Sequence, residues 1–117
     1  MFAQRLTVAV TTDGAGAATS YSTALTGQIK AIVYVKTDFA NGVDFAITLE
    51  ATGETLWTGT NVDASATVYP VTAATVASTG AASVLLQVPI VAANDRVKII
   101  ISSGGATKTG TFYVVVT

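Results

Sequence analysis

The sequence predicts an all-β fold, an antiparallel, jelly-roll-like β-sandwich of about seven to eight strands. Three observations predict it. Hydrophobic and polar residues alternate over most of the 117 residues, as in strands with one face in a core and the other in water. Dipeptides that favour tight turns recur at short intervals, and no segment shows a helical period. We therefore expect a single domain over residues 1–117, large enough for a core without metal or disulfide staples.

The first half of the chain predicts strands over residues 2–12, 28–37, 43–50 and 54–60. The small-residue tract 14–24 between the first two predicts either a loop or an irregular edge. Alternation along the second strand places Ile32 and Tyr34 on its outer face, between lysines. In the fourth strand Trp57 follows Leu56, so we expect it to point to the opposite face, either under a loop or in an interface.

The second half predicts strands over residues 67–71, 83–88, 96–102 and 109–116. The tract 71–82 again consists of small residues and predicts a loop or an irregular edge. The last strand has apolar residues on both faces, with Phe112 in the core and Tyr113 and Val115 on the other side. The order of the strands does not follow from these patterns.

The absence of His and Cys narrows the classes of function. Without these residues the usual zinc site, a Ser–His or Cys–His nucleophile pair and thiol redox chemistry are excluded. Six basic and seven acidic residues give a formal net charge of −1, which provides no electrostatic footprint for nucleic acid or an anionic membrane. We expect no cofactor, no metal, no nucleic-acid or membrane partner, and no enzymatic activity.

Three motifs with possible chemistry are better explained as turns. The glycine-rich segment 104–110 lacks the spacing of a phosphate-binding loop and is followed by a strand. Asp38, Asn41 and Asp44 bracket one turn but do not match a calcium-binding loop. Glu50 and Glu54 flank the next turn, but an acid–base pair for sugar hydrolysis would need a cleft lined by aromatic and polar groups. We interpret all of these groups as solvated turn residues.

The low proportion of charged residues bears on what covers the surface of the protein. Only 11% of the residues are charged, against about 25% in a typical globular domain. Residues 64–94 carry no charge, but their prolines and hydroxyl side chains do not suit a transmembrane span. Either Thr and Ser hydroxyls keep this surface hydrated, or other chains cover part of it. The uncharged tract 64–94 and the last strand, with its two apolar faces, are the candidate contact surfaces. The candidate contact residues are Ile32, Tyr34, Trp57, Tyr69, Tyr113 and Val115.

The beginning of the chain shows no basic region followed by an apolar run, as a secretory signal would. We therefore expect synthesis and assembly in a cytoplasm.

Two runs of sequence carry a resemblance to a known group. Residues 43–57 read VDFAITLEATGETLW, and residues 94–112 read NDRVKIIISSGGATKTGTF. Both resemble small structural proteins of tailed bacteriophages, and the chain from about Thr26 onward is similar to phage head decoration, or cement, proteins.

The resemblance implies a β-sandwich that binds the outside of an icosahedral capsid and stabilises the contacts between capsomers. The implied partner is a major capsid protein with the HK97-type fold, and the implied location is the virion surface. Copies are implied to associate as trimers or dimers. No individual residue role is transferred by this resemblance.

Two other functions fit the sequence. A tail or head–tail connector component is the alternative within the virion. A carbohydrate-binding β-sandwich module, with Trp57 as its aromatic contact, is the alternative from a different class.

Overall fold

The computed structural model describes residues 3–75 and 77–117, and for residues 83–85 the backbone alone. The all-β prediction is confirmed, with ten strands in the described residues rather than seven or eight. They are β1 (Gln4–Thr11), β2 (Ala18–Tyr21), β3 (Leu25–Lys36), β4 (Val43–Leu49), β5 (Thr55–Val62), β6 (Ala66–Val68), β7 (Val71–Thr75), β8 (Ala82–Asp95), β9 (Val97–Ser102) and β10 (Thr109–Val116). The start of the first predicted strand, at residue 2, lies outside the described residues.

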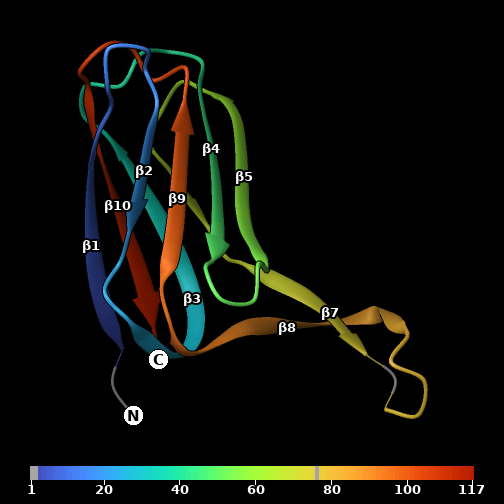
Figure 1. The fold of residues 1–117 in the computed structure, drawn as a ribbon. Coiled ribbons are helices and arrows are strands. Elements are labelled where there is room, and N and C mark those ends of the chain that lie inside the picture. The colour runs from blue at the N-terminus through green and yellow to red at the C-terminus, as the bar shows by residue number, and fades with distance from the viewer. Residues whose placement is uncertain (1–2, 76) are drawn as a thin grey trace.

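The strands form two antiparallel sheets that face each other (Figure 1). Sheet I has the order β1-β10-β3-β8-β7, with the short β6 also paired to β3, and sheet II has the order β2-β9-β4-β5. When β6 and β7 are set aside, the other eight strands renumbered along the chain give the orders 1-8-3-6 and 2-7-4-5. This is the strand order of a jelly roll, so the predicted jelly-roll-like sandwich is confirmed.

Two strands lie in tracts for which the sequence predicted loops or irregular edges. β2 lies within residues 14–24 and pairs with β9 through four residues. β7 lies within residues 71–82, and its partner β8 is longer than the strand predicted over 83–88. Segments of alanine, serine and threonine show almost no alternation of hydrophobic and polar residues. Their pairing into strands is therefore hard to predict from the sequence.

The core lies between the sheets and contains a cluster of aromatic rings. The Tyr34 ring lies 5.1 Å from that of Phe112 and 5.2 Å from that of Phe45, between ring centroids. Phe45 also makes an edge contact with Trp57 at 4.7 Å. Rings at these separations add to the stabilisation that burial provides.

The prediction that Ile32 and Tyr34 face outward is wrong. Both side chains are 0% exposed in the core. Val115 pairs with Ala31 and Val116 with Ile29, so Lys30 is an extra residue in β3. This β-bulge shifts the alternation by one position, and the residues after it exchange faces. Ile32 and Tyr34 therefore cannot be surface contacts in this fold.

The predicted orientation of Trp57 is also wrong. Trp57 pairs with Ile47, whose side chain is in the core, while Thr55 pairs with Thr48. Leu56 is thus an extra residue in β5, and this second bulge brings Trp57 to the same side of the sheet as Ile47. Trp57 is half-buried and packs against the core from sheet II.

A two-stranded arm leaves the sandwich. Along β8 toward the arm, Ile90 is the last residue that pairs with β3. Beyond this pair, β6 takes the place of β8 beside β3. The next residue toward the arm is Pro89, which has no N–H with which to extend the ladder to β3. Residues 71–89, here called the arm, project from one end of the sandwich as β7 and the outer part of β8 (Figure 1). The molecule consequently measures 49 × 29 × 22 Å.

Candidate interaction surfaces

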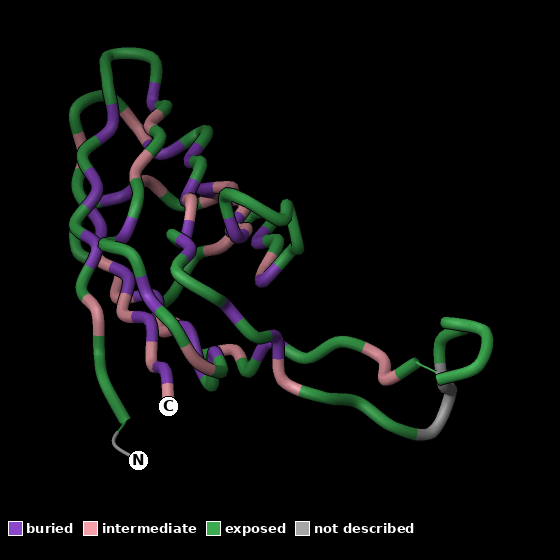
Figure 2. The backbone as a smooth tube through the Cα atoms, turned by 60° about the horizontal axis from the view of Figure 1, so that its bottom comes forward, coloured by how far each residue is buried: buried purple, intermediate pink, exposed green. Residues whose placement is uncertain are grey.

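Exposed apolar side chains are concentrated on the arm and at its base. Seven large hydrophobic residues are exposed in the described part of the chain, and five of them lie between residues 69 and 91. They are Tyr69, Val71, Leu86, Val88 and Val91. The same segment has no charged residue, and its backbone is exposed over most of its length (Figure 2). Because large exposed apolar patches are typical of sites of association, the arm is the first candidate surface.

One face of the arm is an uncovered continuation of the sandwich interior. Along β8, Ile90 and Ala92 point into the core and are 3% and 1% exposed. Val88 and Leu86 follow in the same alternation, yet they are 42% and 64% exposed. Ile90 belongs to the core cluster, whereas sheet II does not extend over the arm (Figure 1). The arm thus presents side chains of core type without the second layer that would bury them.

The backbone of the arm is also incompletely paired. Among the described residues, four Cα pairs join β7 to β8, with an irregularity between Ala73 and Thr75. Beyond Ile90 the described parts of the two strands pair with each other and with no further strand, so each has a free edge there. Two-stranded ribbons are marginally stable alone in water, and uncharged edges invite pairing or packing by another chain.

The outer face of sheet I is a second candidate surface. Tyr113 and Val115 lie there half-buried, beside Val33 and Ala31 of β3. Strand β10 has no charged residue, and Arg5 is the one charged residue of β1. The Arg5 guanidinium lies 4.6 Å from the centroid of the Tyr113 ring, so its charge stacks on this face. Lys30 of β3 is exposed next to Ala31, and the rest of this surface is mostly uncharged.

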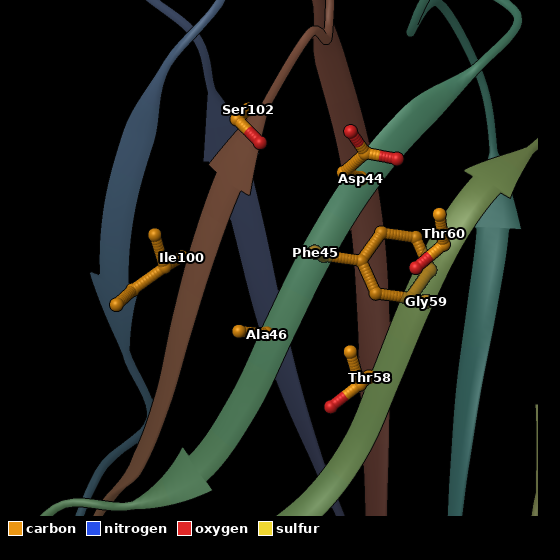
Figure 3. A pocket seen from close by; sticks show the side chains of 8 residues that line it. All are labelled: Asp44, Phe45, Ala46, Thr58, Gly59, Thr60, Ile100 and Ser102. Carbon is orange, nitrogen blue, oxygen red and sulfur yellow. The ribbon is translucent and has the colours of Figure 1, made fainter.

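A hollow of about 260 Å³ lies on the outer face of sheet II (Figure 3). Its residues are Asp44, Phe45, Ala46, Thr58, Gly59, Thr60, Ile100 and Ser102. Gly59 lets the Phe45 ring pack closely against β5, because a Cβ at position 59 would come within 2.5 Å of that ring. Asp44 is the single ionisable residue of this lining, and its carboxylate accepts the Asn61 N–H at 2.7 Å. The hollow is smaller than ligand pockets of about 300–1,000 Å³ and offers no acid–base pair.

The turn carboxylates are occupied by structural contacts. Asp63 accepts the Gly42 N–H at 2.7 Å, and Lys36 donates to the side chain of Asn41. Glu50 forms an exposed ion pair with Arg96. No group of three or more potential metal ligands occurs among the described residues. That part of the chain also has no helix long and apolar enough to cross a membrane.

The six predicted contact residues have different positions in the structure. Tyr69 is 71% exposed at the base of the arm, and Tyr113 and Val115 share the outer face of sheet I. Leu86 and Val88 were not among the individually predicted residues, but both lie in the uncharged tract 64–94 that was predicted as a contact surface.

Comparison with protein-family models, curated proteins and solved structures gives no match to this chain.

Proposed function

We propose that this protein is a non-enzymatic structural component of a tailed-phage particle that decorates the outer surface of the head and stabilises contacts between capsomers. The observation that carries the proposal is the uncharged, apolar arm projecting from a jelly-roll body. The sequence resemblance described above supplies the class of particle.

The physical role follows from repetition. A coat protein contacts several neighbours at once, so modest contacts become strong when many copies are held on one lattice. A protein that binds the assembled shell and not its separated subunits stabilises the assembled state. An arm that extends beyond its own body is suited to bridging neighbours.

The geometry gives less support to the other functions. Because Trp57 packs inward against Phe45, it does not form an open aromatic platform for a sugar ring. The hollow on sheet II has one carboxylate, already hydrogen-bonded, which favours a role without catalysis.

Cryo-electron microscopy of particles of a phage that encodes this chain tests the proposal. We expect density for the jelly roll on the outside of the head shell, at repeating positions between capsomers. Absence from the head shell would overturn the proposal. Density in the tail or the connector would also overturn it, and would support the alternative within the virion.

A further inference from the structure

We propose that the arm of one copy lies across the outer face of sheet I of a second copy. The inference rests on the proposed function in one respect, because a coat places many copies of the chain side by side. It adds to that function the two surfaces through which copies of this protein join.

The arm requires a cover that its own chain does not provide. Leu86 and Val88 continue the inward-facing row of β8 past the end of sheet II and remain largely exposed. The arm extends away from its own sandwich, and its tip does not return to it (Figures 1 and 2). Burial of these side chains therefore needs another molecule, and each fully buried Leu or Val side chain contributes about 1.5–3 kcal/mol.

The outer face of sheet I matches the arm chemically. The arm has no charge, and any charged group that it covered would lose its hydration without gaining a partner. Val33, Tyr113 and Val115 offer an apolar strip on the central strands, and the Arg5 charge lies at the side, on the Tyr113 ring. The outer face of sheet II carries both an acidic and a basic residue on its central strands, Asp44 and Lys98. On the central strands of sheet I, Lys30 is the one exposed charged residue.

The size of the contact determines the form of the assembly. A ribbon of two strands is roughly 20 Å long and 10 Å wide over the paired part of the arm. One such contact is well below the roughly 800 Å² per partner of a stable interface. When every copy both gives an arm and receives one, the buried area per copy doubles, and a dimer or a ring is the closed assembly that leaves no arm uncovered.

Disulfide trapping tests the contact directly, because the chain has no cysteine of its own. Purified Leu86→Cys and Val115→Cys variants are mixed and oxidised, and the crosslinked product is identified by mass spectrometry. The matched control replaces Val115→Cys with Thr58→Cys, which is exposed on the outer face of sheet II. We expect the first mixture to give the 86–115 crosslink at least about tenfold faster than the control mixture gives 86–58.

Size-exclusion chromatography with light scattering provides the second measurement. We expect an oligomer for the unmodified chain and for Ile100→Asp, an exposed apolar position on sheet II. Leu86→Asp should give a monomer with an unchanged circular dichroism spectrum, because its side chain is 64% exposed within one chain.

Three results would overturn the inference. They are a monomeric unmodified chain at about 100 µM, a dominant 86–86 crosslink that indicates stacked arms, and an 86–58 crosslink as fast as 86–115. These experiments use the purified chain without particles, so their failure is distinct from absence of the protein from the head shell.

Discussion

The hydroxyl group of Tyr34 lies inside the aromatic cluster without a hydrogen-bond partner among the described residues. Burial raises the pKa of this phenol, since the charged form would lose its hydration. A buried donor without a partner reduces stability, whereas the ring itself contributes packing. We predict that Tyr34→Phe leaves the free energy of unfolding unchanged or raises it by up to about 1 kcal/mol.

Urea denaturation of the two chains measures this difference, with Tyr34→Ala as the control that removes the ring. The control should lose about 3–5 kcal/mol. A loss of more than about 1 kcal/mol in Tyr34→Phe would show that the hydroxyl makes a stabilising hydrogen bond.

Asp13 organises the loop between β1 and β2. Its carboxylate accepts the N–H groups of Ala15 at 2.8 Å and Ala17 at 3.0 Å. The hydrogen bonds from Ala17 and Ala15 lower the pKa of Asp13 below its ordinary value of 3.8. Because the pKa of Asp13 is lower in the folded than in the unfolded chain, the stabilisation is fully present above the ordinary pKa of 3.8. It is lost as the pH falls through the lower pKa of the folded chain.

We therefore predict that Asp13→Asn is less stable than the unmodified chain at pH 7, and that the difference shrinks below about pH 4. Asparagine keeps one acceptor oxygen but not the charge. Urea midpoints at pH 7 and at about pH 2.5 measure the effect. A difference that is the same at both pH values would contradict the assignment of the stabilisation to the carboxylate charge.

Among the strands, alternation predicted those rich in branched and aromatic residues and failed at the bulges. Val43 to Leu49 alternates without interruption, and its burial follows the predicted faces. Lys30 and Leu56 are each an extra residue relative to the paired strand, and the type of side chain at these positions does not indicate a bulge. A single extra residue reverses every face beyond it, which is why Ile32, Tyr34 and Trp57 were misplaced.

The arm was predictable as a surface but not as a structure. An uncharged tract of small residues indicated contacts with other chains, and Tyr69 was placed among them. Its pairing into β7 and β8 depends on where β8 leaves β3, a long-range feature that local patterns do not contain.

Strand β10 has two faces with different sensitivities to charge. Val114 is 0% exposed, so Val114→Asp places a carboxylate in the core and should prevent folding. Val115 is half-buried on the outer face, so Val115→Asp should fold and lose assembly or attachment to the particle, and Tyr113→Asp should behave similarly. Circular dichroism and light scattering distinguish these outcomes.

Lys108→Ala is the control for this strand. Lys108 lies 3.9 Å from Asp38 in an exposed ion pair, which contributes about 0–1 kcal/mol at most. This variant should fold and assemble normally. Equal assembly of Lys108→Ala, Tyr113→Asp and Val115→Asp would argue against a contact on this face.

Across the whole molecule, charge is concentrated at the two ends of the sandwich. Asp13, Asp63 and Lys108 lie in loops at one end, while Glu50 and Arg96 lie at the other. The arm has none. A contact between the arm and sheet I therefore depends on the removal of apolar surface from water and hardly on ion pairs.

This distribution predicts how the assembly responds to salt. Raising NaCl from about 0.05 M to about 0.5 M shortens the screening length severalfold and weakens contacts between exposed charges. We expect the dissociation constant of the oligomer to change by less than about twofold over this range, and sulfate to tighten it, because sulfate strengthens apolar burial. Sedimentation velocity at each salt concentration measures it, with the unfolding free energy of Leu86→Asp as the control for effects on folding. A weakening of tenfold or more in NaCl would mean that charged loops, and not the arm, hold the copies together.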